Sequence, residues 1–263
     1  MKSFCLKGKF VLVTGGYGHL GEGICRAFLA AEAKVIVGGR DEKKFKSVFS
    51  DLLKNKSLAF VDLDISSEDA IKKSFKLFQA KFGHLNVLVN NAISSPHLKS
   101  KGVKVQGADV WREGLLGNLE TVQNVTETFL PLLKKSKFPS VINISSMYGF
   151  VAPDFDIYRG SKAPAPSPSY YGVAKAGVIQ LTKYMASLYG PEGIRFNCVS
   201  PGPFPKQVVK DNKKFADDLA QRTLLSRLGT PAEVGGPCVF LASEAASYIT
   251  GHNLIVDGGW SVR

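Results

Sequence analysis

Residues 10–21 read FVLVTGGYGHLG, and this stretch decides the fold. Residues 10–14 form an apolar run, which is typical of a parallel strand covered on both faces. A glycine-rich turn comes next, and apolar residues then recur with helical spacing at Ile24, Ala27, Phe28 and Ala31. A strand, a glycine loop and a helix in this order place a phosphate group at the helix N-terminus. The stretch therefore predicts a nucleotide-phosphate site, with a ligand-free glycine turn as the alternative.

Strand and helix patterns alternate along the whole chain. Further strand runs are expected at residues 35–37, 58–61, 87–89, 141–144, 196–199 and 253–256. Helices are expected at residues 67–82, 108–134, 170–188, 207–221 and from 230 onward. Ser66 has the position of an N-cap, and Thr230 with Glu233 has the pattern of a capping box. This alternation predicts an α/β fold, a single-domain, Rossmann-type, doubly wound parallel sheet with helices on both faces, over residues 1–263.

In a doubly wound sheet, the ligand lies beyond the carboxyl ends of the strands. The distinctive residues of this chain follow the expected strands at that edge: Gly15, Arg40, Asp64, Asn91, Ser146 and Pro201. At the end of the second strand, an acidic residue would bond the ribose hydroxyls, whereas an arginine accommodates a 2′-phosphate. Gly39 offers no carboxylate and Arg40 offers a cation. We therefore expect NADP(H) as the cofactor, with NAD(H) possible and a plain surface arginine as the alternative.

Tyr171 and Lys175 stand four residues apart in the helix expected at 170–188, so both side chains point the same way. A free phenol titrates near ~10, and a nearby ammonium group favours the phenolate and lowers that pKa. Such a pair can exchange a proton with a substrate oxygen. The same spacing also occurs in chance surface pairs, so a catalytic role for this pair has to be supported by other parts of the chain.

Three other segments carry unusual residues. Asn118 falls inside the helix expected at 108–134, where its side chain competes for backbone groups. Asn118 is therefore expected to be either a functional residue or an ordinary surface residue. Residues 96–107 are expected to be irregular. The loop 147–169 carries four prolines, which fix φ and make it stiff.

The composition bounds the class of protein. With 263 residues, 44% of them hydrophobic, the chain can bury one large α/β core. No run of about 18 apolar residues indicates a membrane span, and the first residues, 1–10, lack a signal-peptide core. A soluble cytoplasmic protein is expected. The four cysteines lie far apart without CxxC spacing and the four histidines are scattered, so neither disulfides nor a metal site is expected.

The formal net charge is +12, and the lysines occur in small groups near the ends of amphipathic segments. Solvated helix faces explain such groups. An anionic ligand or a nucleic acid is the alternative. The sequence has no helix-turn-helix, zinc-finger or aromatic-rich basic pattern, so no nucleic-acid partner is expected.

Together these motifs resemble the short-chain dehydrogenase/reductase family, and the resemblance covers residues 9–260. Tyr171 and Lys175 match its YxxxK motif. Ser146 matches its catalytic serine, and Asn118 matches the asparagine of its long helix. Four turns match its cofactor motifs, namely the glycine loop at 14–21, the adenine contact at 64–65, the NNAG turn at 90–92 and the PG turn at 200–202.

The resemblance implies four catalytic residues: Asn118, Ser146, Tyr171 and Lys175. It implies cofactor contacts at Gly15, Tyr17, Gly18, His19, Leu20, Gly21, Arg40, Asp64, Ile65, Asn91, Ala92, Tyr171, Lys175, Pro201, Gly202 and Phe204. Hydride would pass between nicotinamide C4 and a substrate carbonyl carbon. Tyr171 would exchange a proton with the substrate oxygen, which Ser146 would polarise. Lys175 would lower the tyrosine pKa and bind the nicotinamide ribose, and Asn118 would anchor a water that relays protons.

Several positions depart from the family pattern. His19 stands where the loop TGxxxGxG has glycine, so residues 15–21 spell the GxxGxxG of extended family members. Ile93 replaces the glycine of NNAG, and Phe-Pro at 204–205 lies where a threonine often contacts the nicotinamide carboxamide. The connection between the catalytic serine and tyrosine is longer than usual. In this it resembles a subgroup of bacterial reductases of sugar and surface-glycan metabolism.

The loops 147–169 and 203–225 are expected to border a small-molecule substrate. Their cationic side chains include Arg159, Lys162, Lys206 and Lys210. The substrate is therefore predicted to bear a carboxylate or phosphate, as a sugar acid or a nucleotide sugar does. Asp154 and Asp156 in the first loop argue against this prediction.

Two other classes of function stay open on the sequence. One is a cofactor-binding regulatory protein that has lost turnover, which the intact catalytic residues oppose. The other is a basic nucleic-acid binder on the same fold. Residues 248–260 are apolar and glycine-rich, and family members pack such C-termini across two-fold interfaces. We therefore expect a homotetramer, with a dimer as the alternative.

Overall fold

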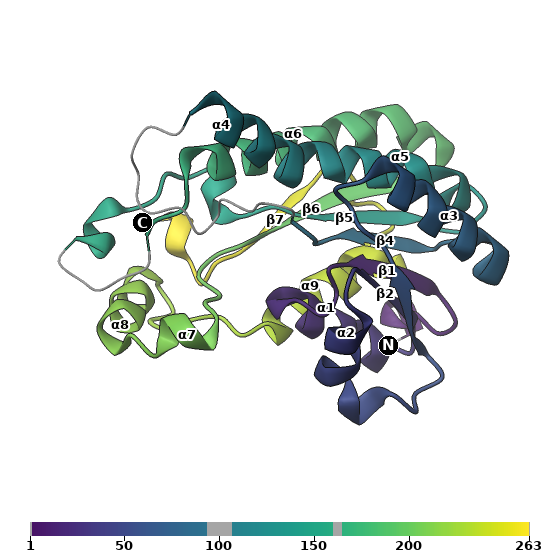
Figure 1. Ribbon diagram of the computed structural model, residues 1–263, viewed down its shortest axis with the longest axis horizontal. Coiled ribbons are helices and arrows are strands. Elements are labelled where there is room, and N and C mark those ends of the chain that lie inside the picture. The colour runs from purple at the N-terminus through teal and green to yellow at the C-terminus, as the bar shows by residue number, and fades with distance from the viewer. Residues whose placement is uncertain (1, 94–106, 160–164, 263) are drawn as a thin grey trace.

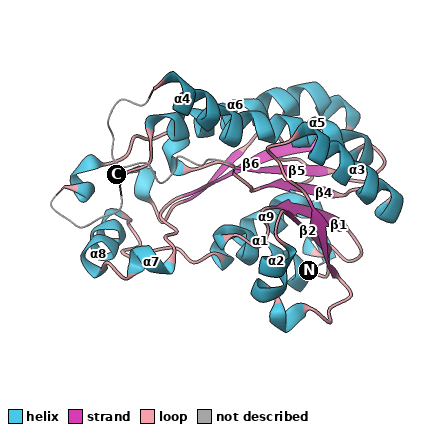
Figure 2. Cartoon of the chain, viewed as in Figure 1, coloured by secondary structure: helices cyan, strands magenta, loops and turns pink. Residues whose placement is uncertain are grey.

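The computed structural model describes residues 2–93, 107–159 and 165–262. Within them lies one seven-stranded sheet, in which every neighbouring pair is parallel and the strand order is β3-β2-β1-β4-β5-β6-β7 (Figure 2). The strands are β1 (Phe10–Thr14), β2 (Lys34–Gly39), β3 (Leu58–Asp62), β4 (Val87–Asn90), β5 (Ser140–Ile144), β6 (Arg195–Pro201) and β7 (Asn253–Val256). Each strand coincides with an apolar run in the sequence, and the predicted doubly wound α/β fold is confirmed.

The helices of the described residues connect these strands. They are α1 (His19–Ala30), α2 (Glu42–Val48), α3 (Glu68–Phe82), α4 (Ala108–Leu115), α5 (Thr121–Leu133), α6 (Ser169–Tyr189), α7 (Gln207–Lys210), α8 (Lys213–Arg222) and α9 (Ala232–Ala242). The sequence analysis did not predict α2. This short helix is capped by Asp41, whose carboxylate accepts a hydrogen bond from Lys44 N at 2.9 Å.

Helices cover both faces of the sheet (Figure 1). Val11 and Val13 of β1 pack against α1 and α9, in a core that contains Ile24, Phe28 and Val234 among others. Leu12 points to the other face, where α3, α5 and α6 contribute Phe78, Phe129 and Met185. Because both faces are covered, strand residues of either orientation are apolar. In Figure 1, α7 and α8 lie apart from both layers, beyond one end of the sheet.

The N-terminus of α3 corrects one prediction. Ser67, not Ser66, is the N-cap, and its hydroxyl accepts a hydrogen bond from Ala70 N at 3.3 Å. Ser66 instead donates its hydroxyl to Asp64 Oδ1 at 2.6 Å. The two serines are adjacent, and only the chain direction after β3 decides which of them faces the first turn of the helix.

The helix predicted at 108–134 is interrupted. Between α4 and α5, residues Leu116–Glu120 form a π-helical turn with Asn118 at its centre. Asn118 Nδ2 donates to the Gly114 carbonyl at 2.8 Å. A Cβ at Gly114 would lie 2.3 Å from the ring of Tyr170, so this helix packs closely against α6. Such π turns often occur at functional sites.

Two further helix predictions need refinement. The segment predicted as one helix at 207–221 divides into α7 and α8, because the Asn212 side chain accepts from Phe215 N at 3.3 Å and starts a new helix. At the start of α9, Glu233 Oε2 accepts from Thr230 N at 2.9 Å, which is the half of the predicted capping box that forms. The predicted irregular segment 96–107 lies outside the described residues, except for Gly107, which is the N-cap of α4.

The loop predicted at 147–169 contains two short 3₁₀ turns, Met147–Gly149 and Phe155–Tyr158. A small apolar cluster joins this loop to α8 and the C-terminal turn: Met147, Ile157, Phe215, Leu219 and Trp260. Asp154 in the loop and Arg222 of α8 form an ion pair at 2.6 Å. Within the part of the chain that the structure describes, no helix has the length and apolar character needed to cross a bilayer.

Candidate active site

A cavity of about 400 Å³ opens where β1, β2, β4 and β5 end. Many of the predicted cofactor residues line it: Gly15, Tyr17, Gly18, His19, Leu20, Arg40, Asp64, Ile65, Asn91, Ala92, Tyr171, Lys175 and Phe204. The glycine loop and the Tyr171–Lys175 pair therefore share one cavity although they lie far apart in the sequence. This is the ligand position that a doubly wound parallel sheet predicts.

Three predicted cofactor residues do not line this cavity. Gly21 is buried under the glycine loop, where a Cβ would lie 2.4 Å from the carbonyl oxygen of Gly15. Pro201 is buried at the end of β6, and a Cβ on Gly202 would lie 2.5 Å from Cα of Asp257. These residues allow close approach of backbone segments around the site instead of facing the cavity.

Hydrogen bonds join the glycine loop to the turn after β4. The Thr14 hydroxyl accepts from the backbone N–H groups of Asn91 and Ala92, both at 3.0 Å. The Asn91 side chain donates to the carbonyls of Thr14 and Gly15, at 2.9 and 3.1 Å. Gly15 has φ of +62°, which only glycine adopts without strain. The hydrogen bonds from Asn91 to two carbonyl groups of the loop thus hold the glycine loop in place at the cavity.

At the end of β2, Arg40 lies beside Asp64 with a distance of 3.8 Å between Nη1 and Oδ2. Burial alone would raise the pKa of Asp64, but hydrogen bonds from the Ser66 hydroxyl and N–H, with the Arg40 cation, outweigh it and hold that pKa below its ordinary value. The carboxylate is therefore ionised at neutral pH. Arg40 keeps an exposed side chain that is only loosely paired.

At the other end of the cavity, Lys175 is almost fully buried, with 4% of its surface exposed. Its Nζ donates to the Ile144 carbonyl at 2.9 Å and lies 5.7 Å from the centre of the Tyr171 ring. Burial lowers the pKa of Lys175 to about 8. A group with that pKa can change its protonation state near neutral pH.

The Tyr171 hydroxyl forms a hydrogen bond with the side chain of Ser146. Burial raises the pKa of Tyr171, and this hydrogen bond only partly opposes the effect. Lys175 is not among the groups that shift this pKa, so the expected lowering by Lys175 is not seen, and the net shift is upward. The reason is that the surrounding protein displaces water from Lys175 and from much of Tyr171, which disfavours the charged form of each. Tyr171 accordingly keeps its proton at neutral pH.

Asn118 is the fourth predicted catalytic residue, and it lies buried in the π turn. Its amide nitrogen is bound to the Gly114 carbonyl, whereas its Oδ1 has no hydrogen-bond partner among the described residues. Buried side-chain oxygens nearly always have a partner. Asn118 thus offers a free acceptor from inside the helix.

His19 bridges the glycine loop and the segment after β6. Its Nε2 lies 3.1 Å from the Phe204 carbonyl oxygen, and since a carbonyl only accepts, Nε2 carries the hydrogen. Burial, opposed by the bond to Phe204 and assisted by Lys206 and Lys210, lowers the pKa of His19, so the ring is neutral at neutral pH. The residue that replaces a family glycine is therefore a link across the mouth of the cavity.

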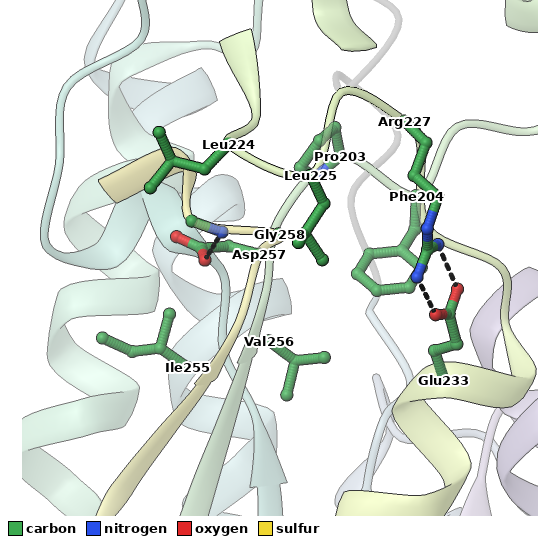
Figure 3. A pocket seen from close by; sticks show the side chains of 12 residues that line it. Pro203, Phe204, Leu224, Leu225, Arg227, Glu233, Ile255, Val256, Asp257 and Gly258 are labelled. Atoms are coloured by element: carbon green, nitrogen blue, oxygen red, sulfur yellow. Dashed lines mark hydrogen bonds and ion pairs between the residues drawn. The ribbon is translucent and has the colours of Figure 1, made fainter. Parts of the chain in front are cut away.

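Phe204 separates this cavity from a second one of about 410 Å³. Figure 3 shows the Phe204 ring beside the ion pair of Arg227 and Glu233, with apolar side chains of the C-terminal segment on the other side. A Cβ at Gly229 would lie 2.3 Å from the Phe204 ring. The position of this ring is thus set by close packing on its outer side.

The sequence analysis did not single out three residues of the cavity wall: Leu63, Ile144 and Ser145. Lys206, which was predicted to border the substrate, does line the cavity, together with Gly39 and Ile93. The sequence analysis also left out Thr14 as a site residue, although Thr14 organises the glycine loop. The position of Thr14 at the last residue of a strand before the loop was a usable signal. The other wall residues line the cavity because of how the strand ends come together in the fold, and no local sequence pattern indicates this.

Comparisons with known proteins agree with the function that the geometry of the site suggests. Residues 18–261 match a family profile described as enoyl-(acyl carrier protein) reductase. A 3-oxoacyl-[acyl-carrier-protein] reductase, FabG, of Chlamydia muridarum is 33% identical over 261 residues, which cover 97% of this chain and 98% of that protein. The chain belongs to the short-chain dehydrogenase/reductase family.

Two other relatives are named as dehydrogenases of sugar acids. A 2-dehydro-3-deoxy-D-gluconate 5-dehydrogenase of Bacillus subtilis is 32% identical over 267 residues, covering 99% of this chain and 98% of that protein. A crystal structure of a gluconate 5-dehydrogenase from Burkholderia cenocepacia, in complex with NADP and tartrate, has a TM-score of 0.86 at 26% identity and covers 99% of this chain and 98% of that chain.

A third structure is that of a short-chain dehydrogenase from Leptospira borgpetersenii with bound NAD⁺, with a TM-score of 0.85 at 30% identity, covering 99% of this chain and 96% of that chain. The short-chain dehydrogenase/reductase described here is accordingly an NAD(P)-dependent oxidoreductase that acts on carbonyl or CH–OH groups. These relatives are all named as reductases or dehydrogenases, so they do not support the two alternative functions, a regulatory protein or a nucleic-acid binder.

The buried lysine makes stability depend on pH in a defined way. A lysine with a folded pKa of about 8 and an ordinary pKa of 10.5 binds fewer protons when folded than when unfolded between these two values. The free energy of unfolding therefore rises with pH across this window, by about 3 kcal/mol if the shift is fully expressed. Lys175→Met should lack this rise in urea-unfolding curves of the cofactor-free enzyme at pH 7, 8, 9 and 10.

Lys183→Met is the matched control, since Lys183 lies exposed on the same helix. It should follow the wild-type profile. Parallel pH profiles for the wild type and Lys175→Met would contradict the buried, perturbed state of Lys175.

Proposed function

We propose that the chain acts as a single NAD(P)-binding domain, residues 1–263, which interconverts a ketone and its secondary alcohol with NADP(H) preferred over NAD(H). One observation carries this proposal. A single cavity has the glycine loop and Arg40 at one end and Tyr171 and Lys175 at the other. A dinucleotide needs such an extended site, with phosphate groups near a helix N-terminus and the reactive ring near a proton donor.

The residues present fit such a cofactor. The N-terminus of α1 has no side-chain cap, so its first N–H groups are free to face a pyrophosphate. Gly15 adopts a positive φ that brings backbone to the cavity wall. The Oδ1 of Asn118, which has no hydrogen-bond partner among the described residues, offers a buried acceptor for a water molecule.

The bound nicotinamide supplies or accepts the hydride. Tyr171, which keeps its proton at neutral pH because burial raises its pKa, donates that proton to the substrate oxygen during reduction. Ser146 donates a hydrogen bond to the same oxygen, where negative charge develops. Lys175 binds the nicotinamide ribose and supplies positive charge beside the phenol. Asn118 holds a water through its free Oδ1 and thereby returns protons toward Lys175.

NADP(H) is the preferred cofactor because Arg40 extends from the end of β2 with an exposed cationic side chain. Gly39 leaves no carboxylate at the position that would bind ribose hydroxyls. The solved relatives include one with NADP and one with NAD⁺, so both cofactors occur in this family. The local charge favours the phosphorylated one.

We propose an anionic substrate of the sugar-acid class. Lys206 lines the cavity, and Lys210 lies close enough to influence His19. The acidic residues that opposed this prediction are both paired, Asp154 with Arg222 at 2.6 Å and Asp156 with Arg159 at 3.1 Å. The second pair also engages Arg159, whereas Lys206 and Lys210 form no ion pair within the described residues. Lys162 lies outside the described residues.

Tyr171→Phe should remove the proton donor and keep the ring. We expect NADPH consumption with a reducible ketone to fall by about a thousandfold, while NADPH binding followed by fluorescence changes by less than about threefold. Tyr184→Phe on the exposed face of the same helix is the control. Retention of most activity in Tyr171→Phe would reject the proposed proton donor.

The substrate class is tested with a keto sugar acid and the neutral ketose of equal carbon number. The anionic compound should have a kcat/KM at least about tenfold higher. Lys206→Gln should reduce that ratio, and Lys213→Gln, an exposed residue of α8, should not. Equal kcat/KM values for the two compounds would exclude an anionic preference.

We also propose a cytoplasmic homotetramer, with a dimer as the alternative. Large apolar side chains are exposed on α6 and in the C-terminal segment, namely Val173, Leu188, Ile255 and Val262. Such surfaces often mark interfaces between subunits. Light scattering should give a mass four times, or else twice, the 28.4 kDa of one chain. A particle of 28.4 kDa at micromolar concentration would rule out both assemblies.

A further inference from the structure

Tyr17 is the one phenol of the glycine loop, and it lines the cofactor cavity. Its hydroxyl oxygen accepts hydrogen bonds from the backbone N–H groups of Arg40 at 2.9 Å and Asp41 at 3.1 Å. These two donors occupy both lone pairs of the oxygen, so the hydroxyl hydrogen points elsewhere. Within residues 2–93, 107–159 and 165–262, no protein group accepts that hydrogen.

The Tyr17 ring lies against Gly39 at the end of β2. A Cβ at position 39 would lie 2.3 Å from Cε1 of Tyr17 and 2.6 Å from its hydroxyl oxygen. The ring therefore excludes any side chain at position 39. This is the strand end where a carboxylate would bind ribose hydroxyls. Tyr17 and a ribose-binding acid at position 39 cannot be present together without moving the ring.

The surroundings of the phenol are cationic. Lys44 Nζ lies 5.6 Å from the centre of the Tyr17 ring, and Arg40 follows Gly39 directly. The nearby acids are engaged, because Asp41 caps α2 and Asp64 accepts from Ser66 and lies beside Arg40. A hydroxyl that already accepts two hydrogen bonds is a stronger donor. A donor and two cations together suit a phosphate dianion better than a neutral hydroxyl group.

We propose that Tyr17 determines the specificity for the adenosine ribose by donating its hydroxyl hydrogen to the 2′-phosphate of NADP(H). This inference rests on the proposed preference for NADP(H). The backbone N–H groups of Arg40 and Asp41 act through the phenol and do not bind the phosphate themselves. The adenosine end of the cofactor is thus recognised by a side chain of the glycine loop together with Arg40 and Lys44.

The test uses adenosine 2′,5′-bisphosphate and adenosine 5′-monophosphate, which contain only the adenosine end. Calorimetry on the full chain should show tighter binding of the bisphosphate. Tyr17→Phe retains the ring on Gly39 and loses the donor. It should weaken the bisphosphate about tenfold, which is roughly 1.4 kcal/mol, and change the monophosphate by less than about twofold. Tyr248→Phe, at a fully exposed tyrosine, is the matched control and should change neither.

A second variant, Gly39→Ala, should displace the ring and cause a similar selective loss of the bisphosphate. Unchanged or tighter bisphosphate binding in Tyr17→Phe would overturn the inference, since tighter binding means that the freed backbone N–H groups hold the phosphate. Equal loss of both compounds would also overturn it, because that is the effect of a disturbed loop. If the wild type binds the bisphosphate no better than the monophosphate, the NADP(H) preference itself fails, and this result comes from the wild type alone.

Discussion

The site depends on the burial of one ammonium group. Lys175 lies inside the protein, with its Nζ bonded to the Ile144 carbonyl at the end of β5. The backbone of the same residue is held as well, because the Ser145 hydroxyl donates to the Lys175 carbonyl at 2.7 Å. A Cβ at Gly149 would lie 2.8 Å from the carbonyl carbon of Lys175. The helix α6 is thereby held against the end of β5, and Ser146 meets Tyr171 as a consequence.

The parallel sheet supplies the second constraint. Because all strand pairs in the described residues are parallel, the segments after β1, β4 and β5 emerge at one edge. Thr14 and Asn91 connect the first two of these segments by mutual hydrogen bonds. The segment after β5 carries Ser146. The predicted site residues are concentrated where these connections meet, and two departures from the family pattern, His19 and Ile93, line the same cavity.

Much of this arrangement can be predicted from the sequence. The strands are continuous apolar runs, so a local pattern identifies them, and the residue after each strand is then a site candidate, as Gly15, Arg40 and Asn91 are. The π turn at Asn118 could not be predicted, because the helical pattern of the sequence runs on from residue 108 to 134 without a local sign of it. Similarly, spacing alone gave the wrong direction for the pKa of Tyr171, because the depth of burial is a property of the whole fold. The bonds from Arg40 and Asp41 to Tyr17 join residues more than twenty positions apart and leave no local signal.

The central claim is that one bound dinucleotide spans the cavity from Tyr17 and Arg40 to Tyr171 and Lys175. A crystal structure of the protein with NADPH tests this claim most directly. The account predicts the adenosine 2′-phosphate among Tyr17, Arg40 and Lys44, and the nicotinamide ring beside Tyr171 with its ribose bonded to Lys175. Density for the nicotinamide on the other side of Phe204, or an adenosine end away from the glycine loop, would contradict it.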